Sequence, residues 1–106
     1  MERVEYKTSG TTLPLYDVDF TEDLPADSSL NSSDSSVKAY DSSGVEQSAT
    51  IIANKTVSSM ILKADIRAGV DGEDYKVVFR GVGTTTGKPF EHVIEVRVRD
   101  RLTGAL

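Results

Sequence analysis

The sequence predicts an all-β fold, a sandwich of about seven short antiparallel strands. Apolar and polar residues alternate with a period of two over most of the chain, the pattern of a strand with one buried and one solvated face. Turn-forming residues interrupt this alternation roughly every 8–15 residues. Helix signals are weak, because apolar residues rarely recur at helical spacing and Pro14 and Pro25 interrupt the first quarter.

Four short strands are expected in the first half of the chain. They cover residues 3–7, as an edge strand, then 16–20, 36–40 and 49–53. The segment 27–36 reads DSSLNSSDSS and is expected to be a Ser-rich loop or strand edge, because hydroxyl side chains serve turns well. Disorder is the alternative interpretation of such a biased composition.

Three longer strands follow, over residues 58–66, 75–82 and 90–99. The last has the clearest alternation, with one apolar side made of Phe90, His92, Ile94, Val96 and Val98. The link GTTTGKP between the last two strands is rich in turn residues, so they are expected to form an antiparallel hairpin. Residues 67–74 are expected to form a long turn before the hairpin.

The chain length is that of one domain. We expect residues 1–106 to form one sandwich, with flexible ends over 1–12 and 102–106. The absence of Cys excludes disulfides and thiolate metal sites, and a net charge of −5 argues against nucleic-acid binding. The first residues lack the apolar run of a signal peptide, and no run approaches the roughly 20 apolar residues of a membrane span.

Two features could carry chemistry, and a structural role is favoured for both. His92 is the single His and lies on the apolar side of its strand, and a catalytic His would need a hydroxyl or carboxylate partner. The run GVGTTTG over 81–87 superficially resembles a phosphate loop. Its glycine spacing is wrong and a strand follows it in place of a helix, so a hairpin turn is expected.

Carboxylates gather in two groups, which could in principle bind Ca²⁺ through loop oxygens. One group contains Asp17, Asp19, Glu22, Asp23 and Asp27, and the other contains Asp65, Asp71, Glu73 and Asp74. The spacing of an EF-hand is absent, and DGED over 71–74 is a typical turn sequence. We therefore expect no metal site and no cofactor.

Cationic residues gather on the last two strands. Arg97, Arg99 and Arg101 share one side of the final strand, and Lys76 and Arg80 lie on the polar side of the strand before it. These five residues are the candidate interaction surface, because Arg is enriched in protein interfaces. The alternative is a charged, solvated face that keeps the domain soluble and discourages edge pairing.

Several segments carry a resemblance when taken in order. They are YDVDF at 16–20 with Leu24, DSSL at 27–30, the G-x-x-G-x-x-Y turn at 69–75, TTTG at 84–87 and the closing IEVRVRDR at 94–101. Over about residues 13–101 the chain resembles the small bacteriophage virion proteins of the phage fiber–tail adaptor family. The resemblance implies an immunoglobulin-like sandwich with a structural role and without catalytic residues or cofactor.

The resemblance implies that the protein is located at the tail or neck of a phage particle. The partners would be tail, neck or fibre subunits, a homo-oligomer in the particle is compatible with this role, and neither nucleic acid nor membrane would be bound. The protein would be made in the bacterial cytoplasm and would end in the virion. Two alternatives stay open: an immunoglobulin-like or fibronectin-like module of a bacterial surface protein that binds sugar or Ca²⁺, and a small enzyme using His92 or the carboxylates.

Overall fold

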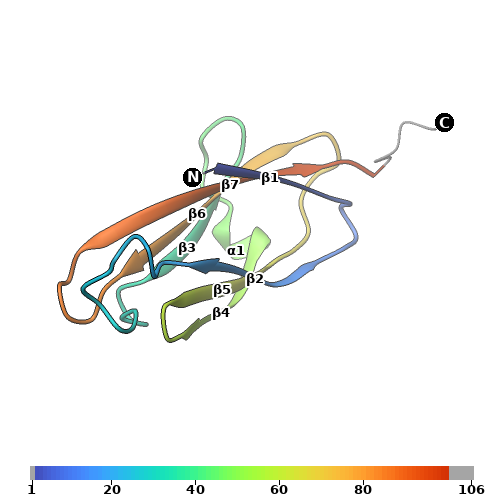
Figure 1. Cartoon of the computed structure of the whole chain (residues 1–106). Coiled ribbons are helices and arrows are strands. Elements are labelled where there is room, and N and C mark those ends of the chain that lie inside the picture. Colours follow the sequence, from blue (N-terminus) through green and yellow to red (C-terminus); the bar gives the residue numbers. More distant parts are fainter. Residues whose placement is uncertain (1, 101–106) are drawn as a thin grey trace.

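The computed structural model describes residues 2–100, which form two β-sheets on either side of a common core (Figure 1). One sheet has the strand order β1-β7-β6-β3, with β1 at Glu2–Lys7, β7 at Pro89–Val98, β6 at Asp74–Val82 and β3 at Ser36–Tyr40. The other has the order β2-β5-β4, with β2 at Leu13–Asp19, β5 at Ile61–Ile66 and β4 at Ile52–Ser58. The mostly β character predicted by the sequence is confirmed.

The core follows from the predicted alternation. Inward side chains of β5, β6 and β7 are buried, and so is Met60 just before β5. They are Leu62, Ala64 and Ile66; Tyr75, Val77 and Phe79; Ile94, Val96 and Val98. Strands β6 and β7 form the expected antiparallel hairpin, in register from Asp74 opposite Arg97 to Val82 opposite Pro89. Phe90 departs from the pattern because it lies beyond the core at the start of β7 and is 41% exposed.

Two strand predictions are corrected. Residues 49–53 are not a strand: Ser48–Ile51 form the single helical turn α1, and β4 begins at Ile52. Ile51 is buried in the core, and the Ser48 hydroxyl accepts the N–H of Ala39, so this turn covers the free edge of β3. The predicted strand 58–66 is likewise two elements, because a turn at 59–60 separates β4 from β5.

The sequence predicted that all the strands are antiparallel, and this prediction is wrong for one pair. Strand β1 runs parallel to β7, with Glu2 opposite Val93 and Lys7 opposite Val98. Residues 2–7, which the sequence placed in an edge strand or a flexible end, thus belong to the four-stranded sheet, whereas residues 102–106 lie outside the described part. Within residues 2–100, no helix is long and apolar enough to cross a membrane.

The Ser-rich segment 27–36 folds back on the sandwich. Leu30 is buried and forms a bridge with Gly83, and the buried Ser35 hydroxyl accepts the N–H of Val82 at 3.0 Å. The Lys55 ammonium donates to the carbonyls of Ser32 and Ser35. The hydroxyl-rich segment is therefore a loop that the Ser35 hydroxyl and two backbone carbonyls bind to the rest of the sandwich.

The turn between β5 and β6 is fixed by Tyr75. Its hydroxyl accepts the N–H of Val70 at 3.1 Å, which ties the turn to the start of β6. Gly69 has φ +102°, and a Cβ there would lie 2.8 Å from Cγ2 of Val98, so the turn needs glycine for both conformation and space. The Lys7 ammonium donates to the carbonyl of Ala68 in the same turn, and burial lowers the pKa of this lysine.

Candidate interaction face

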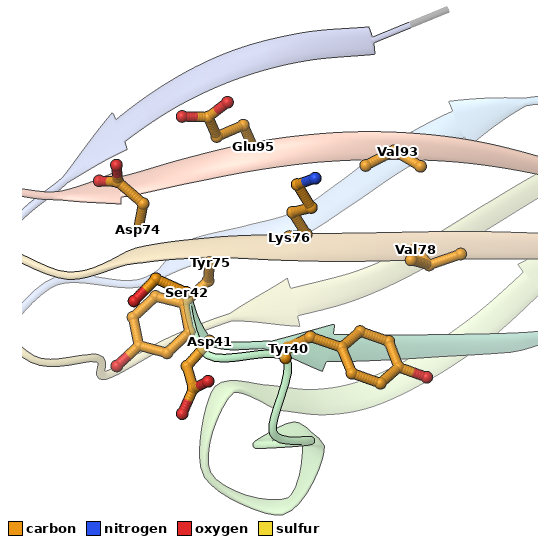
Figure 2. A pocket seen from close by; sticks show the side chains of 10 residues that line it. Tyr40, Asp41, Ser42, Asp74, Tyr75, Lys76, Val78, Val93 and Glu95 are labelled. Carbon is orange, nitrogen blue, oxygen red and sulfur yellow. The ribbon is translucent and has the colours of Figure 1, made fainter.

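Three of the predicted cationic residues lie on one surface, the outer face, which we define as the side of the sheet β1-β7-β6-β3 turned away from the core. The register of β6 and β7 arranges its centre in four cross-strand rows: Asp74 with Arg97, Lys76 with Glu95, Val78 with Val93, and Arg80 with Glu91. Figure 2 shows Asp74, Lys76 and Val78 in sequence along β6, and Val93 and Glu95 along the neighbouring β7. Arg99 follows β7, and the predicted Arg101 lies outside the described residues.

The charges of the outer face are partly paired within the chain. Nε of Arg97 lies 2.8 Å from the Glu95 carboxylate, and its guanidinium also donates to the Tyr6 hydroxyl at 3.0 Å. These contacts raise the pKa of Arg97 above its usual value. The Arg80–Glu91 pair is looser, at 3.9 Å, and within residues 2–100 we find no hydrogen bond or ion pair for the Lys76 ammonium. The face therefore keeps polar groups that a partner can engage.

Arg99 differs from the other three cationic residues. It donates to the Asp74 carboxylate at 2.8 Å and to the backbone carbonyls of Val98 and Glu73. It therefore fastens the end of β7 to the start of β6. The assignment of Arg99 to an interaction surface stays a prediction, and these contacts give it a role in the fold as well.

Strand β1 presents its apolar side to solvent. Val4 is 48% exposed and Tyr6 is 51% exposed, whereas Lys7 is 2% exposed. The other side of β1 contacts β2 through polar groups, because the Tyr16 hydroxyl donates to Glu5 at 2.7 Å and accepts from Arg3 at 3.1 Å. A strand in a stable sandwich normally has the opposite arrangement, with apolar residues inward, and such departures from local rules are typical of functional surfaces.

Sequence reasoning missed Val4 and Tyr6 because alternation alone assigns them to the core. No local sequence pattern indicates their exposure, because Tyr6 contacts a residue 91 positions away: the Arg97 guanidinium lies 5.8 Å from the centre of the Tyr6 ring. Tyr and Arg are among the residues that are enriched where protein interfaces gain their binding energy.

A shallow groove of about 470 Å³ lies on the same face, over β7, β6 and the end of β3 (Figure 2). Its floor includes Lys76, Val78 and Val93, and its wall is formed by Tyr40 at the end of β3 with Asp41 in the following loop. The Asp41 carboxylate accepts backbone N–H groups of Ser43 and Val45, which lowers its pKa and fixes the loop. The outer face thus has an apolar ridge on β1 and a groove beside β3.

His92 does have a carboxylate partner. Nε2 of His92 lies 2.5 Å from Oδ2 of Asp23, and both side chains are mostly buried. The ring packs against Phe20 in an edge-on arrangement, with centroids 5.2 Å apart. Within the described residues, no hydroxyl joins this pair to complete a nucleophile–base arrangement. The contact fastens the loop after β2 to β7, and sequence reasoning had named Asp23 only among the carboxylates.

The glycine-rich hairpin 81–87 is a turn, and an internal carboxylate occupies its backbone donors. Asp27 accepts the N–H groups of Thr85 at 2.7 Å and Thr86 at 3.0 Å, and it also accepts the Thr86 hydroxyl at 2.7 Å. These bonds lower the pKa of Asp27. A phosphate would have to displace this carboxylate, so the structure supports the turn interpretation.

The two carboxylate groups are dispersed. Asp19 bonds to Thr21, Asp65 bonds to the N–H of Leu15 and to Asn54, and Asp71 accepts the N–H of Asp100. Across residues 2–100, no three His, Cys, Asp or Glu side chains are grouped so that they could hold a metal ion.

Comparison of the chain with protein-family models, curated proteins and solved structures gives no match.

Proposed function

We propose that this chain is a non-enzymatic structural protein of a bacteriophage particle, an adaptor of the tail or neck that docks to other virion subunits, and that the outer face is a contact surface in the assembled particle. The observation that carries the proposal is the inverted β1, which exposes Val4 and Tyr6 beside Arg97 and buries Lys7. Exposing apolar side chains has a free-energy cost of about 25 cal/mol per Å². An interaction that covers them in the assembled state accounts for this cost.

The immunoglobulin-like assignment is part of this proposal. Strands β2, β5 and β4 correspond in order to strands B, E and D of such a domain, and β3, β6 and β7 correspond to C, F and G. The bond from the Val70 N–H to Tyr75 also has the form of the tyrosine corner found at the E–F turn of many immunoglobulin-like domains. Strand β1 would be a first strand that joins the sheet of β7.

The motif segments behind the family resemblance contact one another, which supports reading them as one architectural unit. The N–H of Thr84 donates to the carbonyl of Ser29, the hydroxyls of these two residues lie 3.0 Å apart, and Asp27 binds the hairpin. These contacts join DSSL at 27–30 to TTTG at 84–87. The third motif, at 69–75, is the Tyr75 turn.

Particle composition tests the proposal. Virions of the phage that encodes the chain should contain it, as detected by mass spectrometry after gradient purification, and its absence from intact particles would contradict the proposal. Complementation with Val4→Lys should reduce incorporation, because a charge then enters the apolar ridge. The matched control is Val70→Lys at another exposed Val, 65% exposed and away from the outer face. Incorporation equal for both variants would remove the outer face as the docking surface.

The groove beside Tyr40 favours a second candidate, a ligand-binding module of a bacterial surface protein. An aromatic side chain next to carboxylates and an ammonium group is a composition that suits a sugar or a Ca²⁺-assisted ligand. A ligand that binds only the folded state raises the melting temperature. Thermal melts with Ca²⁺ and with a panel of sugars test this candidate, and unchanged melting temperatures contradict it.

A further inference from the structure

The rows of the outer face have a charge order that is complementary to itself. Along β7 the side chains are Glu91, Val93, Glu95 and Arg97, and the residues opposite them on β6 are Arg80, Val78, Lys76 and Asp74. Each charged residue of β7 therefore has an opposite charge at the same row of β6. The one uncharged row, Val78 with Val93, lies inside the charged rows.

This charge order allows two copies of the chain to pair symmetrically through their outer faces. Consider a twofold axis that runs along the strands, between β6 and β7, in the plane where two outer faces meet. The rotation places β7 of one copy over β6 of the second copy at the same row. Arg97 then meets Asp74 of the second copy, Glu95 meets Lys76, Glu91 meets Arg80, and Val93 meets Val78. Sheets that pack face to face keep strand directions within about 30° of each other, which this axis satisfies.

The flanks of the face fit under the same rotation. Strand β1 of one copy lies over β3 of the second, because the two strands occupy opposite edges of the sheet. Val4 is at the row of Glu95, and Tyr40 is at the row of Lys76, so Val4 meets Tyr40 of the second copy. The exposed ridge of Val4 and Tyr6 is thus placed over the groove walled by Tyr40 and Asp41.

We propose that the partner of the outer face is a second copy of this chain, in a twofold-symmetric dimer with the axis between β6 and β7. The inference rests on the proposed use of this face for docking and names its occupant. Strands about 4.8 Å apart with a rise of about 3.3 Å per residue give a face of about 500 Å² per chain. Two such faces reach only the lower limit of specific interfaces, so the dimer is weak, with a Kd in the micromolar range.

A charge-exchange experiment tests both the dimer and its axis. Lys76→Glu gives a chain with carboxylates at both positions of the row, and Glu95→Lys gives a chain with ammonium groups at both. Sedimentation equilibrium up to about 1 mM chain should show dimers of the unaltered protein and a Kd at least about tenfold weaker for each variant alone. An equimolar mixture of the two variants should restore dimerisation, because every contact of that row is then between opposite charges.

The control is Lys63→Glu, the same charge change on β5 of the other sheet, which should keep the Kd of the unaltered protein. Salt at about 0.5 M should weaken the dimer. A monomer at all concentrations, single variants with unchanged Kd, or a mixture that stays monomeric would overturn the proposal. A monomer that still enters particles leaves the adaptor function intact and assigns the outer face to another virion subunit, whereas a dimer absent from particles overturns the adaptor function alone.

Discussion

The β6–β7 hairpin turn and the outer face of the same two strands use charge in different ways. At the turn, the Asp27 carboxylate is 9% exposed and accepts three hydrogen bonds from two residues. On the outer face, the Arg97–Glu95 and Arg80–Glu91 pairs are largely open to solvent, with side-chain exposures between 31% and 55%. Charge enclosed by backbone donors specifies the fold, whereas half-exposed pairs contribute little stability and can exchange partners.

The largest change in stability is expected at the hairpin turn, where the Asp27 carboxylate is enclosed. Gly83→Ala should destabilise the fold by about 3 kcal/mol, because its Cβ would lie 2.2 Å from the Asp27 carboxylate and displace it. Urea unfolding measures the change. Gly10→Ala is the matched control, since no atom lies within 4 Å of the added Cβ, and it should change stability by about 0.5 kcal/mol or less. Equal effects of the two substitutions would show that Asp27 does not organise the turn.

The second prediction separates charge from shape at Asp27. Asp27→Asn keeps the size of the side chain, and one of its two terminal groups becomes a donor that faces the donors of Thr85 and Thr86. Because the folded-state pKa of Asp27 is lowered, its contribution is present above the unfolded pKa of about 3.9 and is lost as pH falls through the folded value.

Urea unfolding of both proteins from pH 7 to pH 2 measures this contribution. The unaltered protein should be the more stable at pH 7, and the difference should shrink below about pH 4. Asp19, Asp41, Asp65 and Asp100 also have lowered pKa values, so both proteins lose stability in acid, and the informative quantity is the difference between them. A difference that does not depend on pH would mean that the charge of Asp27 is unimportant.

The smallest changes in stability are expected for two arginines, Arg99 after the end of β7 and Arg97 on its outer side. Arg99→Ala should destabilise by about 1 kcal/mol, because the carbonyls of Glu73 and Val98 lose their guanidinium donor. Arg97→Ala should have a smaller effect, since its partners Glu95 and Tyr6 remain hydrated. Thermal melts of the two variants decide the order. A larger loss for Arg97 would place it among the residues that fix the fold.

The strands could be predicted from the sequence because alternation is local. The inward residues of β5 and β6 were identified correctly, as were Ile94, Val96 and Val98 of β7, whereas Phe90 was wrongly placed on the inward side. The hairpin followed from its turn residues. Alternation predicts the wrong structure or burial at two places: Ile51 enters the core from a helical turn, and Lys7 is buried while Tyr6 is exposed. The order of apolar and polar residues at both places is the same as in an ordinary strand, so the sequence could not predict either arrangement.

The contacts of the candidate site were predictable only in part. The cationic residues Lys76, Arg80 and Arg97 were placed on one side of two adjacent strands by parity alone, and the register agrees. Their partners required the three-dimensional fold. Tyr6 reaches Arg97 across 91 positions, and Asp23 reaches His92 across 69, which no short-range pattern reports.

The parallel pairing of β1 with β7 also sets an order of events during synthesis. Each residue of β1 pairs with one about 90 positions later, so this strand has no partner until almost all of the described chain has left the ribosome. In that interval its unpaired N–H and C=O groups could join the strands of neighbouring nascent chains. The charges of Arg3, Glu5 and Lys7 oppose such aggregation, which gives these residues a task before the sandwich exists.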